Sequence, residues 1–264
     1  MVRNLAFLDG ALQDKVAIVT GSGQGLGRDI AIAMTQAGAR VAVVDLNAAN
    51  ATKVAEELSA HGEPGMAITC DVSERDQVNA AVAEVVEKMG RIDILVNNAQ
   101  NLRVVQRLFV DTDDALLEAH MRSGLYGTYY FMQACYSQLL EHKGAVVNIG
   151  SAAGTNGLAQ HFAYAATKEA IRATTRVAAH EWGADGIRVN TICPAAYDTP
   201  SMKIFLDKAD DATKEWMLNQ VPLHKFGGGD EVASVAVFLA SDAASYMTGH
   251  TLMVDGGSSM DAGR

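Results

Sequence analysis

The segment 16–27, VAIVTGSGQGLG, joins a short apolar run to a loop that contains four glycines. Val16–Val19 has the length and β-branched content of a buried strand, and the residues after the loop show helical periodicity. Glycines in a strand–loop–helix unit let the chain turn tightly and let a pyrophosphate approach the amides at the helix N-terminus. Glycine turns also occur for purely structural reasons. The position of this loop after a first strand favours nucleotide binding.

The next apolar run, Val41–Val44, ends at Asp45, which lies 24 residues after Gly21. This is near the spacing at which an acidic side chain accepts hydrogen bonds from the adenosine ribose hydroxyls. A carboxylate there repels a 2′-phosphate, so the sequence predicts NAD in preference to NADP. Arg40, before the strand, is the one residue that could weaken this preference. The alternative is that Asp45 serves only as an exposed cap.

Short β-branched runs alternate with helix-length segments along most of the chain. The runs are Val16–Val19, Val41–Val44, Ala67–Thr69, Ile92–Val96, Ala145–Ile149, Ile187–Ile192 and Thr251–Val254. Helical periodicity marks residues 28–37, 50–59, 73–89 and 115–140. The alternation predicts an α/β protein with a single Rossmann-type, doubly wound parallel sheet of about seven strands, flanked by helices on both faces.

No linker or repeat divides the sequence, so we expect one domain over residues 1–264. Residues 195–225 break the strand–helix rhythm and are rich in charged and bulky side chains. In an open α/β fold such a segment is a candidate substrate lid near the ligand crevice. An extra pair of helices packed at the edge of the sheet is the alternative.

The composition excludes several classes of protein. Of the 264 residues, 49% are hydrophobic and 20% charged, and the net charge of −10 disfavours nucleic-acid and anionic-membrane partners. The three cysteines, Cys70, Cys135 and Cys193, lie far apart and match neither a disulfide framework nor a metal site. No apolar run reaches the length of a membrane span. We therefore expect a soluble cytoplasmic protein without a metal.

Tyr164 and Lys168 stand four residues apart in a helix-like segment, so their side chains share one helix face. A cation beside a phenol is expected to lower the phenol pKa toward working pH, as an alcohol-activating base requires. Ser151 follows the run Ala145–Ile149 and places a hydroxyl at the carboxyl end of the sheet, where open α/β folds bind ligands. The tyrosine–lysine spacing alone is common by chance. Its combination with Ser151 and the glycine loop is specific.

From about Gln13 to Gly257 the chain resembles the short-chain dehydrogenases/reductases. The matching motifs, in order, are Thr20–Gly27, Asp71-Val72, Asn97-Asn98-Ala99, Asn148–Ser151, Tyr164 with Lys168, Arg188–Pro194, Phe238–Asp242 and Gly249–Gly257. The resemblance implies reversible hydride transfer between NAD(H) and a secondary alcohol or ketone. It also implies a homotetramer or homodimer.

The resemblance assigns roles to individual residues. Tyr164 is implied as the catalytic acid/base, Lys168 as its pKa partner and cofactor-ribose anchor, and Ser151 as the group that orients the substrate oxygen. The implied cofactor-binding residues are Gly21, Gln24, Gly25, Leu26, Gly27, Asp45, Leu46, Asp71, Val72, Asn98, Tyr164, Lys168, Tyr197 and Thr199.

Three residues depart from the family pattern. Gln100 stands where the family usually has Gly, and its side chain either reaches the cofactor or substrate or lies in solvent. Gly124 stands where the family typically has an Asn held to anchor a water between the lysine and bulk solvent. We expect this relay to be rebuilt from water, with Ser123 or His120 as helpers. Ala195 replaces the glycine that usually follows the proline.

The roles of two further features stay open at this stage. His161 is either a substrate contact or an exposed loop residue, and we favour the loop. The aromatic residues of 126–131 are expected to pack a helix or a subunit interface. The loss of Asn at position 124 motivates one rival function, a nucleotide-binding regulatory or scaffold protein with impaired catalysis.

Overall fold

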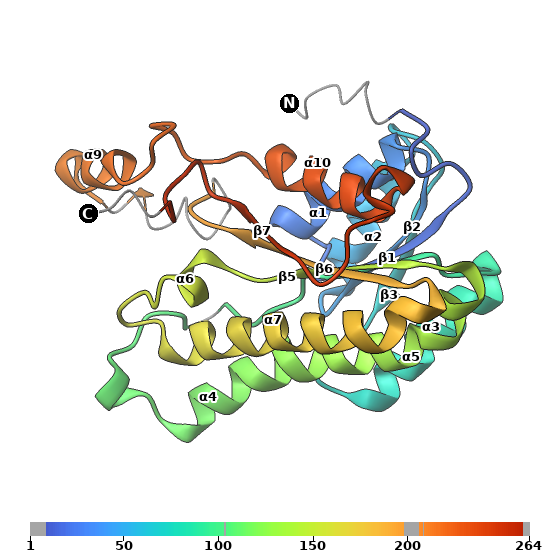
Figure 1. The fold of residues 1–264 in the computed structure, drawn as a ribbon, viewed down its shortest axis with the longest axis horizontal. Coiled ribbons are helices and arrows are strands. Elements are labelled where there is room, and N and C mark those ends of the chain that lie inside the picture. Colours follow the sequence, from blue (N-terminus) through green and yellow to red (C-terminus); the bar gives the residue numbers. More distant parts are fainter. Residues whose placement is uncertain (1–8, 103, 198–205, 208, 261–264) are drawn as a thin grey trace.

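A single seven-stranded sheet organises the computed structural model, which describes residues 9–102, 104–197, 206–207 and 209–260 (Figure 1). The strands are β1 (Val16–Thr20), β2 (Arg40–Asp45), β3 (Met66–Thr69), β4 (Ile94–Asn97), β5 (Ala145–Ile149), β6 (Arg188–Pro194) and β7 (Thr251–Val254). They pair in parallel in the order β3-β2-β1-β4-β5-β6-β7. The order reverses between β1 and β4, and sheets of this kind bind ligands outside the strand ends at such a reversal.

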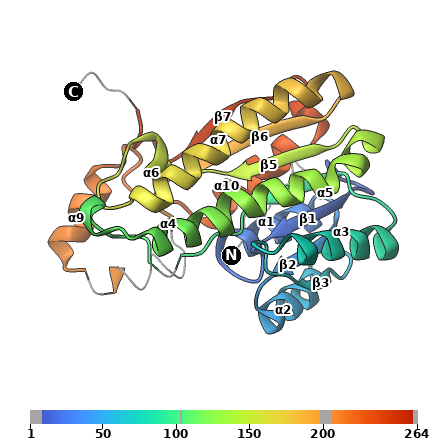
Figure 2. The same cartoon turned by 90° about the horizontal axis from the view of Figure 1, so that it is seen from below.

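Helices cover both faces of the sheet. They are α1 (Gly25–Gln36), α2 (Ala48–Leu58), α3 (Arg75–Met89), α4 (Asp114–Met121), α5 (Gly127–His142), α6 (Ala152–Thr155), α7 (Phe162–Trp182), α9 (Asp211–Asn219) and α10 (Gly229–Ala240). Figure 1 shows α1, α2 and α10 on one face, and α3, α5 and α7 on the other. Figure 2 shows α5 and α7 side by side across the second face. One apolar core lies under each layer.

The buried strands explain why the fold could be predicted. Every residue of β1 and β5 is buried, because helices cover the sheet on both sides and leave no polar face. The predicted doubly wound parallel sheet is therefore confirmed. The seven predicted apolar runs coincide with the seven strands, and their ends differ by at most two residues.

The predicted helix 115–140 differs from the structure in one respect. α4 ends at Met121, a π-helical turn spans Arg122–Tyr126, and α5 then continues in nearly the same direction (Figure 2). Gly124 lies in the centre of this turn, and a Cβ atom there would come within 2.4 Å of Thr167 Cγ2 on α7. The glycine thus permits a close approach of two helices. π-turns of this kind are frequent at functional sites.

The segment predicted to be a lid is described only in part, since residues 198–205 and 208 lie outside the described ranges. Its described part contains α9, which Figure 1 shows beyond the main body of the sheet. No residue of α9 is buried, and Trp216 is 64% exposed. A lid function for this segment stays a prediction.

A ladder of buried polar side chains connects α7 to the sheet. Asn97 Nδ2 donates to Asn148 Oδ1 at 2.9 Å, and Asn148 Nδ2 donates to Thr175 Oγ1 at 2.9 Å. Thr191 Oγ1 also donates to Thr175 Oγ1, at 2.7 Å. All four residues are buried, so each hydrogen bond replaces hydration that the core cannot provide. The ladder fixes α7 over β4, β5 and β6.

The ladder generates a stability prediction. Thr175→Ala removes a partner from both Asn148 and Thr191, so it should lower the free energy of unfolding by about 1–3 kcal/mol. The matched variant Thr174→Ala should stay within about 0.5 kcal/mol of wild type, because Thr174 bonds only the Ala170 carbonyl of its own helix. Urea unfolding of the three proteins measures the difference. Equal losses in both variants would contradict a connecting role for Thr175.

Candidate active site

Tyr164, Lys168 and Ser151 come together at the carboxyl end of β5. Tyr164 lies in the first turn of α7 and Lys168 one turn later, and the Lys168 Nζ atom is 5.6 Å from the centre of the Tyr164 ring. Ser151 lies two residues beyond β5, at the N-cap of α6, where its Oγ accepts from the Ala153 amide at 3.1 Å. Ser151 lies close enough to Tyr164 for its hydroxyl to favour the ionised form of the phenol. The structure thus assembles the predicted catalytic triad of side chains.

Burial determines the charge of these groups. Lys168 is 2% exposed, and its Nζ donates to the Ile149 carbonyl at 2.8 Å. Burial disfavours the ammonium form and lowers the pKa of Lys168 to about 8. Burial also raises the pKa of the Tyr164 hydroxyl, and the hydrogen bond from Ser151 offsets this only in part.

In the chain without a cofactor the pKa of Tyr164 is therefore raised, and not lowered as the sequence predicted, because burial of the phenol is the largest influence on it. Lys168, with a pKa of about 8, stays mostly protonated at neutral pH. Its role as the pKa partner of Tyr164 stays a prediction.

Cys193, near the end of β6, lies against this cluster and was missed by sequence reasoning. A Cβ atom on Gly150 would come within 2.6 Å of the Cys193 Sγ atom, so the glycine gives the thiol its space. Burial raises the pKa of Cys193, which keeps the thiol neutral at the floor of the site. The glycine directly before Ser151 was the one signal in the sequence that another side chain packs there.

The glycine loop fits a pyrophosphate group. Gly21 has a φ of +63°, and a Cβ atom there would meet the Ala99 backbone at 2.8 Å. A Cβ on Gly27 would meet the Gly21 carbonyl at 2.4 Å. α1 begins at Gly25, and its N-cap residue Gln24 makes no side-chain capping bond. Backbone amides at the N-terminus of α1 are therefore available to an anion, as at other phosphate-binding helix ends.

Asn98 holds the loop from the other side of the sheet reversal. Its Nδ2 donates to the Thr20 and Gly21 carbonyls, each at 3.0 Å, and its backbone amide donates to Thr20 Oγ1 at 3.0 Å. In this structure the Asn98 side chain therefore positions the glycine loop.

Asp45 lies at the end of β2, beside the loop. Its Oδ2 accepts from the Gly23 amide and its Oδ1 from the Asn47 amide, both at 2.9 Å. Each carboxylate oxygen has a second lone pair, so these bonds orient Asp45 while leaving acceptor capacity for ribose hydroxyls. Leu46 is 64% exposed next to it.

The remaining predicted cofactor residues lie in different surroundings. Asp71 Oδ1 accepts from the Ser73 amide and hydroxyl at 2.9 and 2.7 Å, and Val72 is buried against Gly127. Tyr197 is buried too, and its hydroxyl donates to the Val254 carbonyl at 2.6 Å. The Tyr197 side chain therefore anchors the start of the predicted lid. Thr199 lies outside the described residues.

The structure changes the interpretation of Gln100. Its Nε2 lies 3.1 Å from His120 Nδ1 and 3.3 Å from Ser123 Oγ, so the side chain points inward and the solvent alternative is wrong. The two expected helpers of the relay, His120 and Ser123, are both engaged by this amide. His161 Nδ1 lies 2.8 Å from the Ala159 carbonyl in the turn before α7, in keeping with the loop interpretation.

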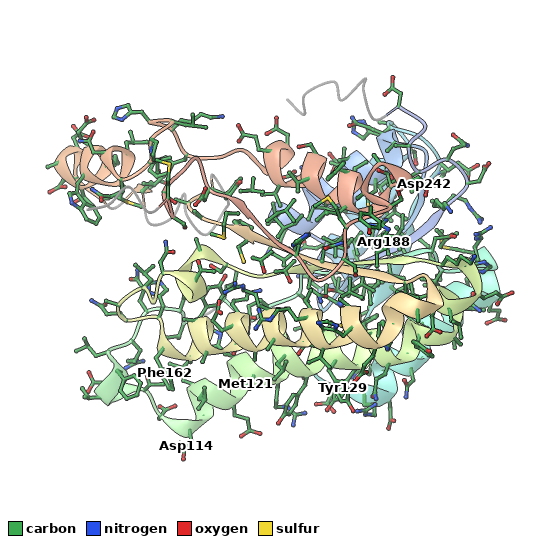
Figure 3. All side chains as sticks on the ribbon, in the orientation of Figure 1. Asp114, Met121, Tyr129, Phe162, Arg188 and Asp242 are labelled. Carbon is green, nitrogen blue, oxygen red and sulfur yellow. The ribbon has the colours of Figure 1, made fainter. Side chains whose placement is uncertain are left out.

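Aromatic side chains gather at two places, at the start of α7 and along α5. Phe162, labelled at the start of α7 in Figure 3, packs on Phe109 with ring centres 4.4 Å apart. Tyr129 lies on the side of α5 turned away from the sheet, and it is 41% exposed (Figure 3). Phe131 and Met132 of the same helix are buried in the core.

The described residues contain three free, buried cysteines and no group of metal-ligating side chains. Among the helices of the described ranges, none has the length and apolarity needed to cross a membrane.

The strand order and the glycine loop define a Rossmann-type dinucleotide-binding fold. Comparison with known proteins specifies the family. The family model described as enoyl-(acyl carrier protein) reductase matches residues 21–259. D-threitol dehydrogenase of Mycolicibacterium smegmatis is 40% identical and covers 94% of both chains. The 12alpha-hydroxysteroid dehydrogenase of a Clostridium species is 37% identical, over 94% of this chain and 98% of the relative.

A solved structure shows the same relationship. The gluconate 5-dehydrogenase of Burkholderia cenocepacia, in complex with NADP and tartrate, matches with a TM-score of 0.88 and 33% identity, over 95% of this chain and 98% of the other. The protein therefore belongs to the short-chain dehydrogenase/reductase family. It is an oxidoreductase of the hydride-transfer type with a nicotinamide cofactor.

The buried lysine generates a prediction about pH and stability. The pKa of Lys168 is about 8 in the fold, against the ordinary lysine value of 10.5, so between these values the unfolded chain binds a proton that the folded chain does not. Stability rises with pH wherever the unfolded state binds more protons. The unfolding free energy of wild type minus that of Lys168→Met should therefore increase by about 2 kcal/mol between pH about 7 and about 9.5.

Denaturant unfolding at several pH values measures this difference. Lys53→Met, which replaces an exposed lysine of α2, serves as the control and should give a level difference. A wild-type-minus-Lys168→Met difference that stays level or falls with pH would show that the buried group keeps its proton in the fold.

Proposed function

We propose that this protein transfers a hydride between NAD and a secondary alcohol or ketone, with Tyr164 as the acid/base. The observation that supports this most is the convergence of Ser151, Tyr164 and Lys168 at the carboxyl end of the sheet, beside the order reversal where the glycine loop lies. A nicotinamide cofactor would supply the hydride acceptor or donor at this edge.

The chain's own residues account for the proton in the direction of oxidation. Ser151 Oγ holds the substrate oxygen, and the Tyr164 phenolate takes the hydroxyl proton as the carbinol hydrogen leaves as hydride. The substrate loses one proton and one hydride and becomes a ketone. In reduction the Tyr164 hydroxyl returns the proton. The Lys168 ammonium uses one of its three N–H donors for the Ile149 carbonyl. The other two could bind the hydroxyls of the cofactor ribose.

The preference for NAD rests on Asp45. Its carboxylate is oriented beside the glycine loop by two backbone amides, and it would lie close to a 2′-phosphate. The dehydrogenase from Burkholderia cenocepacia was crystallised with NADP, so a protein of this fold binds the phosphorylated cofactor. The negative charge at position 45 supports NAD for this chain.

A nucleotide-binding scaffold with impaired chemistry is the second candidate, motivated by Gly124. The intact contacts among Ser151, Tyr164 and Lys168 favour the enzyme. A panel of secondary alcohols with NAD, followed by the absorbance of reduced nicotinamide, separates the two. The homotetramer or homodimer implied by the resemblance stays a prediction.

Removal of the phenol hydroxyl tests the acid/base assignment. Tyr164→Phe should lower kcat by about 10²-fold or more, because the proton acceptor is lost. The dissociation constant of NAD, measured by calorimetry, should change little. Tyr246→Phe, which alters a fully exposed tyrosine, is the control and should keep wild-type turnover. Turnover retained by Tyr164→Phe would rule out the assignment.

Removal of the charge at position 45 tests the cofactor preference. Asp45→Asn keeps the size of the side chain and removes the repulsion of a 2′-phosphate. The ratio of kcat/KM for NAD to that for NADP should fall by about ten-fold or more, which corresponds to about 1.4 kcal/mol. Asp76→Asn, on the exposed start of α3, should leave the ratio unchanged. An unchanged ratio in Asp45→Asn would contradict the ribose role.

A further inference from the structure

The side chain of Gln100 bridges the loop after β4 and the turn between α4 and α5. Its Nε2 lies within hydrogen-bond distance of three acceptors, His120 Nδ1 at 3.1 Å, the His120 carbonyl at 3.3 Å and Ser123 Oγ at 3.3 Å. A carbonyl oxygen can only accept, so the amide nitrogen must face His120 and the orientation of the amide is determined. Gln100 Oε1 therefore points the other way.

The contacts of the His120 ring also determine its tautomer. Its Nε2 lies 2.7 Å from the Val104 carbonyl and must donate to it, so in the neutral ring Nδ1 is free to accept from Gln100. His120 is buried, and its ring packs edge-on against the Tyr164 ring at a centre-to-centre distance of 6.0 Å. Gln100 thus holds a side chain that itself packs against the acid/base.

The Oε1 atom of Gln100 is buried and has no hydrogen-bond partner among the described residues. A buried carbonyl oxygen in this state is a place where an ordered water is expected. A Cβ atom built on Gly124 would come within 2.3 Å of this oxygen and 2.4 Å of Thr167 Cγ2, next to Lys168 on α7. The amide end of Gln100 therefore occupies the space that a side chain at position 124 would need.

We propose that Gln100 is a positioning residue that replaces the side chain missing at position 124: its Nε2 holds His120 against the Tyr164 ring, and its buried Oε1 accepts a hydrogen bond from an ordered water. The two departures from the family pattern, at 100 and 124, then form one matched exchange across a single contact. A side chain from the loop after β4, Gln100, fills the space that a side chain of the helical turn at position 124 would otherwise fill. This inference rests on the proposed acid/base function of Tyr164.

A cycle of variants tests the exchange. Gln100→Gly leaves the pocket empty, and Gly124→Asn places a side chain on top of Gln100. Each should lower kcat by about ten-fold or more, a part of what acid/base groups contribute. Each should also shift the pH dependence of kcat, which a purely structural role would not do, while NAD affinity stays near wild type. The double variant Gln100→Gly/Gly124→Asn should return within about three-fold of wild-type kcat, with the wild-type pH profile.

Thermal unfolding of the same four proteins gives a readout that does not depend on turnover. Gly124→Asn alone should lower the melting temperature, and adding Gln100→Gly should recover a part of the loss, because the contact of residue 124 with Thr167 Cγ2 remains. Single variants with wild-type kcat and pH profile, or a double variant whose losses simply add in both kcat and melting temperature, would overturn the proposal. Absence of turnover in wild type itself would overturn the proposed function and the positioning role of Gln100 in it together, and the unfolding cycle would still decide the exchange.

Discussion

A buried ammonium group sets the geometry of the whole site. Lys168 is 2% exposed, and its Nζ bonds the Ile149 carbonyl at 2.8 Å. A charged group in such a place is costly unless it is hydrogen-bonded, and the last carbonyl of β5 meets this need. The bond joins α7 to the end of the strand, so Tyr164, one turn earlier, is placed beside Ser151. The ladder through Thr175 fixes the same helix further along.

The same burial disfavours the charged form of both groups. The pKa of Tyr164 is raised, so the neutral phenol is favoured, whereas Lys168, with a pKa of about 8, keeps most of its charge at neutral pH. The proposed oxidation needs the phenolate, and a bound oxidised nicotinamide would add positive charge that favours it. A site of this kind would tie activation of the base to cofactor binding.

Much of this could be predicted from the sequence, for reasons that differ between residues. The strands were predictable because burial on both faces makes them continuous apolar runs, and the glycine loop was predictable because its spacing follows from a steric need. The exchange between Gln100 and Gly124 could not be predicted. These residues lie on two elements that come into contact only in the folded protein. The sequence did not predict that the pKa of Tyr164 is raised. Helix spacing identifies the neighbouring residues but does not show how far the phenol is buried from water.

The most direct test of this account is the ionisation of the Tyr164 phenol, measured as the ultraviolet difference titration of wild type against Tyr164→Phe with and without NAD⁺. The account predicts that the phenol titrates above its usual range in the protein alone, and that its pKa falls by about one unit or more when NAD⁺ is bound. A phenol already ionised near neutral pH without the cofactor, or one whose pKa does not fall when NAD⁺ binds, would contradict it.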